Sequence, residues 1–261
     1  MKNFILIFLF VLFLFQSFAQ NDTIPNISTD RPTVVISPYI IPKGSFQIES
    51  GVIYTNRNDQ TDIQEKWDYA TTLLRYAIFD NFEVNLFSSY QSTKVYVKED
   101  QQDSIYSGMG PVTAGFKIKL LEERGIRPEL AIFGSITFRH LGSKYYSPTY
   151  SYPIGILAAT NTLGKRFSIG YNIGFAYDGE TADGFFIYAV YLGFQITNRL
   201  WSFAEVFGDF DNGNFPNHKI DGGLTYCLRH NLQIDLTGGT GLSSDVNKYF
   251  INAGISWRIP R

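Results

Sequence analysis

The strongest constraint on the fold is an alternation of apolar and polar residues with a period of two, which begins at Ser45 and recurs to the end of the chain. The clearest run is residues 167–177, where Phe, Ile and Tyr alternate with Ser, Gly, Asn and Ala. This period is the signature of a β-strand with one apolar face. The chain contains about twelve such runs, so we expect an all-β protein.

The polar faces of these runs decide between the possible β architectures. Nearly every run carries small or charged residues there, which suits a wet lumen better than a dry core between two sheets. Many runs also approach the roughly 9 to 11 residues of a tilted transmembrane strand. Residues 45–261 are therefore predicted to form a transmembrane up-and-down antiparallel β-barrel. A soluble lipocalin-like barrel is the alternative, but it would need fewer strands and an apolar interior.

The composition agrees with a membrane barrel. A mean hydropathy of −0.07 does not argue against one, because barrel strands are apolar on one side only. The aromatic content of 16%, with 17 Tyr and 23 Phe, suits the aromatic girdles at the two membrane interfaces.

The N-terminus has the pattern of an export signal. Lys2 precedes an apolar run from Phe4 to Phe15, and the small residues Ser17 and Ala19 follow. Residues 1–19 are predicted to be a signal peptide cleaved after Ala19, because the apolar run is too short to cross a bilayer as a helix. Residues 20–44 contain four prolines and no periodicity, which predicts an irregular periplasmic leader or plug.

Short and long connections alternate along the chain. Short turns, such as residues 80–81 and 229–231, alternate with longer polar segments, such as 56–65, 92–107 and 141–150. In an outer-membrane barrel the turns are periplasmic and the loops extracellular, which would place both termini in the periplasm. The long loops are acidic, but a solvated loop is the simpler interpretation and no metal site is predicted.

Charge and motif content exclude several function classes. The net charge of −2 provides no basic stripe for nucleic acid, and the single Cys227 excludes an intramolecular disulfide. No cofactor motif is present, and the three histidines have no metal-ligand spacing. The remote enzymatic alternative is an outer-membrane lipase using His140 and Ser143, but no acid or Asn is placed to orient the imidazole, so we expect no enzyme.

The alternation also predicts which charged side chains point into the lumen. Their signs nearly balance, which favours a hydrogen-bonded interior over an ion-selective ring, although the same side chains could also contact a solute. These candidates are Glu49, Arg75, Glu83, Lys117, Lys119, Arg139, Glu205, Asp221, Asp235 and Arg258.

Two segments carry a family resemblance: Thr29-Asp30-Arg31-Pro32, and the first strand with its approach, PKGSFQIESG over residues 42–51. Leu74-Arg75-Tyr76 and Gly115-Phe116-Lys117 fit the same pattern. From about Asp30 to the C-terminus the chain resembles outer-membrane barrels labelled as transporters of a meta-pathway of phenol degradation. The resemblance implies a membrane barrel and uptake of small hydrophobic or aromatic compounds. One departure is the C-terminus, where Trp257 is followed by four further residues, whereas many barrels end in an aromatic residue.

The expectation is therefore an outer-membrane channel of a Gram-negative bacterium, with Asp30 and Arg31 as plug residues. The alternative is a structural or surface-interaction barrel with a closed lumen. The expected partners are outer-membrane lipid and lipopolysaccharide, the barrel-assembly machinery and an unidentified small solute.

Overall fold

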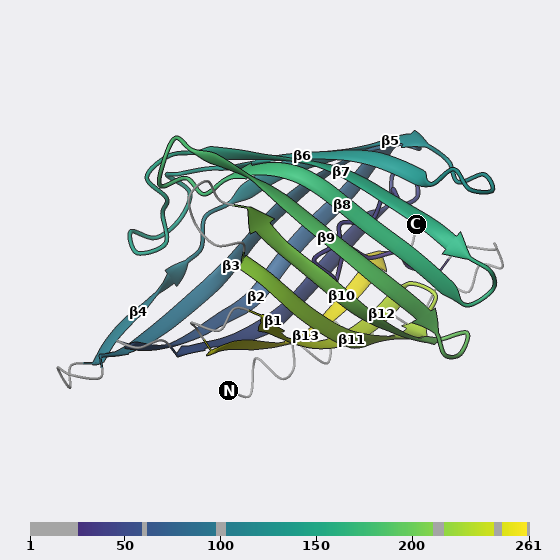
Figure 1. The fold of residues 1–261 in the computed structure, drawn as a ribbon. Helices are drawn as coiled ribbons and strands as arrows, with labels where there is room; N and C mark the ends of the chain where they lie inside the picture. Colours follow the sequence, from purple (N-terminus) through teal and green to yellow (C-terminus); the bar gives the residue numbers. More distant parts are fainter. Residues whose placement is uncertain (1–25, 59–61, 98–102, 211–216, 243–246, 260–261) are drawn as a thin grey trace, which may run out of the picture.

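The structure of the chain, a computed structural model, describes residues 26–58, 62–97, 103–210, 217–242 and 247–259. These residues form one thirteen-stranded sheet closed into a barrel (Figure 1). The strands are β1 (Phe46–Asn58), β2 (Asp62–Phe79), β3 (Phe82–Val97), β4 (Asp103–Met109), β5 (Thr113–Leu121), β6 (Glu129–Thr137), β7 (Tyr152–Leu163), β8 (Phe167–Tyr177), β9 (Gly184–Gln195), β10 (Leu200–Phe210), β11 (Asn217–Arg229), β12 (Leu232–Gly241) and β13 (Asn247–Ile259).

All strand pairs are antiparallel, and the barrel closes where β1 pairs with β13, from Phe46↔Ile259 to Asn58↔Asn247. One strand is shared: β3 pairs with β5 over Phe82–Phe87 and with β4 over Tyr90–Tyr96. β4 and β5 therefore occupy together the place of one barrel strand beside β3. The predicted twelve-stranded up-and-down barrel is confirmed, with one extra strand.

The break between β4 and β5 has a local cause in residues 110–112. Pro111 has no N–H to donate to a ladder, so the strand is interrupted there. The Val112 N–H donates instead to the carbonyl of Leu141 in the following loop (3.0 Å).

The expected long loops at 56–65 and 92–107 were wrong, since strands occupy most of both ranges. In these segments the backbone ladder continues past the apolar run, because strand pairing does not require an apolar face. In Figure 1 the far ends of β3 and β4 accordingly project beyond the neighbouring strands.

The distribution of side chains is inverted relative to a water-soluble protein. Arg75, Lys117 and Glu83 are completely buried, whereas Ile173 and Phe186 on the outer face are 60% and 59% exposed. An apolar exterior with an ion-paired interior is stable only when the exterior contacts lipid. Among the described residues, no helix is long and apolar enough to cross a membrane.

Aromatic side chains gather towards both ends of this apolar surface. Phe79, Phe82 and Phe116 form a chain of ring contacts near one end, at centroid distances of 6.4 Å. Towards the other end, Trp67 lies 4.8 Å from Tyr54 and 5.8 Å from Tyr69. Two such girdles mark the edges of the band that a membrane barrel presents to lipid.

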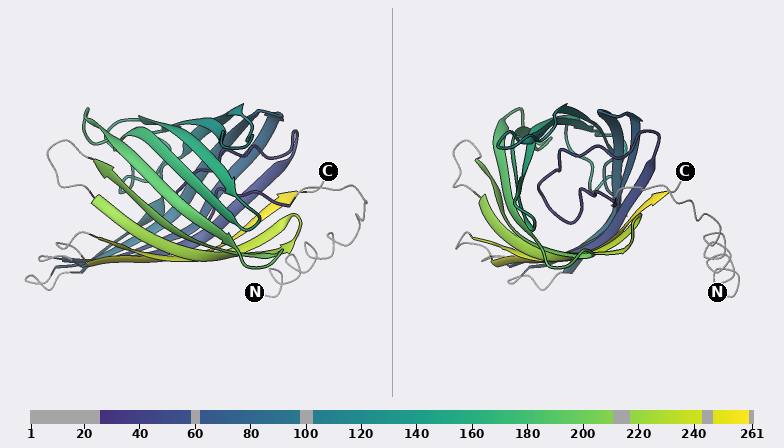
Figure 2. Two further views of the ribbon diagram at one scale, coloured as in Figure 1. Left: turned by 45° about the vertical axis from the view of Figure 1, so that its right-hand side comes forward. Right: turned by 90° about the vertical axis from the view of Figure 1, so that its right-hand side faces the viewer.

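The leader, residues 26–44, lies inside the barrel rather than beside it (Figure 2, right). It begins beside the β11–β12 turn, where the Ile27 N–H donates to the carbonyl of His230 (2.7 Å). It returns to the same end, where the Gly44 N–H donates to the carbonyl of Ala77 (2.6 Å). We call this end, which carries the turns at residues 80–81, 164–166 and 230–231, the turn end, and the opposite end the loop end.

Candidate functional site in the barrel lumen

The leader forms no strand, so side chains of the barrel wall must satisfy its backbone N–H groups. Carboxylates supply most of these acceptors. Glu49 accepts from the amides of Asp30 and Arg31 (3.0 Å each), and Glu83 accepts from the amide of Ile41 (3.1 Å).

Deeper in the barrel, Glu205 accepts from the amides of Val34 (2.8 Å) and Val35 (2.6 Å). Asn172 binds both sides of one residue, accepting from the Ile36 N–H (2.7 Å) and donating to the Ile36 carbonyl (3.0 Å). The leader is therefore held along its length by polar contacts to strands on opposite sides of the barrel.

Asp30 is the acidic centre of the leader. Its carboxylate accepts from Lys117 Nζ at 2.9 Å, lies 3.5 Å from Arg75 Nη1, and accepts from the Ser37 hydroxyl (2.9 Å). Burial alone would raise the pKa of Asp30, but the positive charges of Arg75 and Lys117 outweigh burial and lower it to about 2. Asp30 is thus a carboxylate at every physiological pH.

Arg75 is the basic centre of the wall. Its guanidinium donates to Glu83 (2.9 and 3.0 Å) and to Glu49 (2.9 Å), and also to the leader carbonyl of Tyr39 (3.1 Å). The Arg75 side chain is fully buried, and a buried cation is tolerable only when its donors are paired in this way.

Arg31 contacts side chains of β2, β12 and β13. Its Nη2 donates to Asn252 (2.6 Å) and to Asp235 (3.1 Å), and its Nη1 donates to Thr71 (3.3 Å). Two paired glycines, Gly51 and Gly254, make room for it. A Cβ at Gly51 would lie 2.7 Å from Arg31 Cζ, and one at Gly254 would lie 2.5 Å from it. The paired glycines therefore form a notch for the guanidinium, which we call the Arg31 notch.

Most of the sequence-derived lumen candidates meet in this network. Glu49, Arg75, Glu83, Lys117, Glu205 and Asp235 all contact the leader or one another, as do the expected plug residues Asp30 and Arg31. Asp221 is buried opposite Glu205 but does not contact the leader through any described hydrogen bond.

The remaining three candidates are Lys119, Arg258 and Arg139. Lys119 is at the turn end, 3.7 Å from the exposed Glu122 and 3.8 Å from Glu129. Arg258 is buried on β13 opposite Gln47. The assignment of Arg139 to a strand was wrong, because β6 ends at Thr137, where the chain turns to bond with residue 112, and Arg139 is an exposed loop residue.

Sequence reasoning missed the neutral members of the site. Asn172, Asn252, Thr71 and the glycines of the Arg31 notch all contact the leader, but attention to charge alone passed over them. Asn172 and Asn252 could have been found, because each places a large amide on the polar face of a clear period-two run, where most other residues are small.

Six inward-facing side chains of the lumen wall are apolar, which the alternation did not predict. Phe207 lies two residues beyond Glu205 on the inward face of β10, and Phe250 lies two residues from Asn252 on β13. Ile156 and Ile187 meet over Gly174, with Cγ1 atoms 2.9 and 3.1 Å from where its Cβ would be. Leu73 pairs with Phe87 on the same inward face. We call these six side chains the apolar ring.

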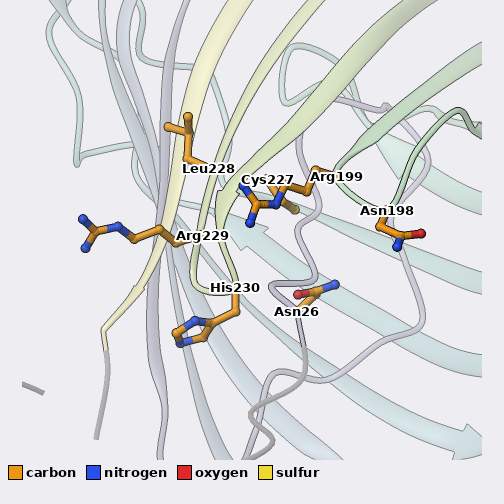
Figure 3. A pocket seen from close by; sticks show the side chains of 7 residues that line it. All are labelled: Asn26, Asn198, Arg199, Cys227, Leu228, Arg229 and His230. Atoms are coloured by element: carbon orange, nitrogen blue, oxygen red, sulfur yellow. The ribbon is translucent and has the colours of Figure 1, made fainter. Parts of the chain in front are cut away.

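A pocket of about 450 Å³ lies at the turn end, beside the first described residues of the leader (Figure 3). It is formed by the leader, the β9–β10 turn and the β11–β12 turn. Its lining residues are Asn26, Asn198, Arg199, Cys227, Leu228, Arg229 and His230. Within the described ranges, no cluster of three or more His, Cys, Asp and Glu side chains could hold a metal ion.

The lipase alternative gains no support from the loop that carries it. Ser143 Oγ is buried without a hydrogen-bond partner, and no described hydrogen bond joins it to His140. The Ser143 backbone is structural, since its N–H donates to the carbonyl of Met109 (2.8 Å) and anchors the loop to β4.

Comparison with solved structures shows the same fold in proteins of very different sequence. The COG4313 outer membrane channel from Pseudomonas putida F1 superposes with a TM-score of 0.63 at 11% identity, covering 85% of this chain and 97% of that one. The translocator domain of the autotransporter NalP from Neisseria meningitidis gives 0.54 at 9% identity, covering 84% and 90%. The KdgM porin gives 0.50 at 7% identity, covering 80% and 99%.

No curated protein sequence matches the chain. A family profile does match, and it spans both the leader and the barrel. The match confirms the resemblance carried by the Thr29–Pro32 segment and the first strand. The profile is described as "Putative MetA-pathway of phenol degradation" and covers residues 29–259, and the chain belongs to this family.

Proposed function

We propose that the protein is an outer-membrane channel for small hydrophobic or aromatic solutes, closed on its turn side by the leader acting as a plug. The observation that carries the proposal is the leader itself, which is bound inside the lumen by Glu49, Glu205 and Asp30 contacts rather than by strand pairing. Side-chain contacts of this kind can be exchanged for water without breaking the barrel, so the plug can leave while the wall stays intact.

The apolar ring supports the solute class. A hydrophilic solute gains nothing from Phe207, Phe250 and Ile187, whereas an aromatic compound exchanges water for apolar contact there. The family description, which names phenol degradation, and the outer-membrane channel among the similar structures agree with this reading.

The outer membrane is the proposed location, with the turns and the leader on the periplasmic side. The exposed apolar band with its aromatic ends supports a membrane, and a closed barrel without free edges is the form in which strands cross one. A closed structural barrel is the competing function, because a bound leader alone does not distinguish a gate from a permanent filling.

Solute flux tests the proposal. The refolded mature protein is placed in liposomes, and entry of phenol is compared with entry of a sugar too polar to cross unaided. Since phenol also crosses lipid, the rate in protein-free liposomes is subtracted from each rate, and the Phe207→Ala variant is measured beside the wild type. Phe210→Ala is the matched control, because Phe210 lies on the same strand but on the outer face.

We expect phenol entry to exceed sugar entry in the wild type, and Phe207→Ala to reduce that preference while Phe210→Ala leaves it unchanged. Equal flux of both solutes in all three proteins would contradict the solute class. Absence of any flux, with the barrel proven folded by heat-modifiable mobility, would favour the closed structural barrel.

A further inference from the structure

Two buried carboxylates face each other in the wall where the leader residues Val34 and Val35 are bound. Glu205 and Asp221 are directly opposite in the β10–β11 register and are 1% and 5% exposed. Directly opposed residues of an antiparallel pair have Cβ atoms roughly 4.5 to 5.5 Å apart, so the two inward carboxyl groups are close neighbours. Among the described residues, no Lys, Arg or His nitrogen forms an ion pair with either one. This pair therefore differs from the acids around Arg75 and Lys117, each of which has a cation.

The neighbouring inward side chains include one cation, Lys219, which forms no ion pair with either carboxylate among the described residues. The side chains on the same face of the adjoining strands are aromatic, small or neutral except for one lysine and one aspartate, both further towards the loop end. From β9 these are Ala189 and Tyr191, from β10 Phe203, Phe207 and Asp209, from β11 Lys219 and Gly223, and from β12 Thr237 and Gly239. Lys219 Nζ lies 5.7 Å over the Phe207 ring rather than at a carboxylate. The leader contributes only backbone at this point.

Two ionised carboxylates cannot remain adjacent in such a site, because both burial and mutual repulsion oppose the second charge. The hydrogen bonds indicate which oxygen atoms carry the charge. Both Glu205 oxygens accept leader amides, and acceptance of N–H groups stabilises a carboxylate. Neither Asp221 oxygen has an assigned partner, although both are buried. If the proton resides on Asp221, its O–H donates to Glu205, and one of the two buried Asp221 oxygens gains a partner.

We propose that Asp221 and Glu205 form a carboxyl–carboxylate pair that binds one proton, and that this proton latches the leader to the wall at Val34 and Val35. Loss of the proton places a second negative charge beside Glu205. The repulsion is relieved when Glu205 turns towards water, which breaks its hydrogen bonds to the two amides. The direction follows from this order: the latch is closed at lower pH and opens as the pH rises.

The latch would regulate the proposed channel, and its physiological consequence rests on that proposed function. Its test therefore measures docking of the leader, which does not depend on transport. The reporter is Val35→Cys in a Cys227→Ser background. Val35 is 1% exposed in the docked leader, and Cys227 is the only cysteine of the natural chain. The full mature chain is refolded into liposomes, and the rate of maleimide labelling is measured between about pH 6 and about pH 9, which lies above the ordinary carboxyl pKa.

The matched comparison is the same reporter with Asp221→Asn, since the amide keeps a donor to Glu205 but cannot ionise. The ratio of the two labelling rates cancels the titration of the thiol. A docking equilibrium that is linked to one proton changes by up to about tenfold per pH unit. The labelling rate of the reporter, divided by its rate with Asp221→Asn, should therefore rise with pH by up to about tenfold per unit. Asp209→Asn, an acid-to-amide change on the same strand face, should leave the rise intact. If Asp221→Asn does not fold, Glu205→Gln gives a second test, with weaker docking and no dependence on pH.

A ratio that stays constant with pH would overturn the latch. Protection of Val35→Cys at high pH by added Ca²⁺ or Na⁺ would also overturn it, since the pair would then bind a cation and not a proton. Conductance recorded at the same pH values separates the two proposals. Docking that changes with pH while conductance does not would refute the plug as a gate and leave the latch standing.

Discussion

Replacement of Asp30 by Asn tests the ion network that holds the leader. The change keeps the size of the side chain and removes the charge that Lys117 and Arg75 both contact, at 2.9 and 3.5 Å. Lys117 would then retain Glu83, at 3.7 Å, and the carbonyl of Tyr39, at 3.5 Å, while Arg75 would retain Glu49 and Glu83.

The magnitude follows from the burial of the partners. Removing one member of a buried ion pair leaves its partner uncompensated and typically costs about 3 to 5 kcal/mol. The remaining acids offset part of this cost, so we take about 2 kcal/mol as the loss to docking, close to that of a single hydrogen bond to a charged group. A loss of about 2 kcal/mol shifts the docking equilibrium roughly thirtyfold.

The assay is single-channel recording of the refolded mature protein in planar bilayers. We expect the Asp30→Asn variant to spend roughly thirty times longer in the undocked, larger-conductance state relative to the docked state than the wild type does. Glu122→Gln is the matched control, because Glu122 is a 66% exposed acid whose contact with Lys119 should contribute almost nothing. Identical open-state occupancy in Asp30→Asn and Glu122→Gln would refute the reasoning.

Three further predictions follow from the same structure. Gly254→Ala places a methyl group in the Arg31 notch and should undock the leader, which raises protease cleavage within residues 26–44. Gly238→Ala is the control and should not raise cleavage, because the nearest atom to its new Cβ would be 3.6 Å away. Equal cleavage of the two variants would show that the notch does not hold the leader. Asp30 has a lowered pKa in the folded state, so its contribution of roughly 2 kcal/mol is present above its unfolded value of 3.8 and is lost as the pH falls towards 2. Leader docking, followed by the occupancy of the larger-conductance state, should weaken over that window in the wild type. In Asp30→Asn the part of this change that is due to Asp30 should be missing. Ile173→Lys, on the outer face of β8, should lower the free energy of unfolding in bilayers by about 2 to 4 kcal/mol, while Ile105→Lys near the end of β4 should have little effect; similar losses would contradict the proposed membrane band.

The barrel could be predicted from sequence because its inside and outside differ at every second residue. In β8, Phe167, Tyr171 and Ile173 face outwards, while Asn172 on the inner face contacts the leader, so the strand, its faces and its bounds all follow from one pattern. The same pattern placed Glu49, Arg75 and Lys117 in the lumen before any contact was known.

The pattern failed where the contrast between the faces disappears. β3 continues to Val97 through polar residues, and β4 begins within a segment that was expected to be a loop. Beyond the apolar band the strands are held by backbone hydrogen bonds alone, so their side chains need not alternate. Inward phenylalanines such as Phe207 and Phe250 were missed because an apolar residue on the polar face is indistinguishable from a break in the alternation.

The path of the leader could not be predicted either. Its contacts join residues up to 221 positions apart, as between Arg31 and Asn252, and no local periodicity encodes them. The sequence does show the chemistry: a charged Asp30-Arg31 pair within a segment of prolines, and acidic and basic side chains in nearly equal number on the lumen face.

The central claim, that the leader closes a solute pathway, is tested most directly by the conductance of the mature protein with and without residues 20–44. Both forms are refolded into planar bilayers, and heat-modifiable mobility shows that each barrel has formed. We predict small or rare steps for the full mature chain and larger, sustained steps after truncation. Equal conductance in the two forms, or silence in both, would contradict the claim that the leader is the gate.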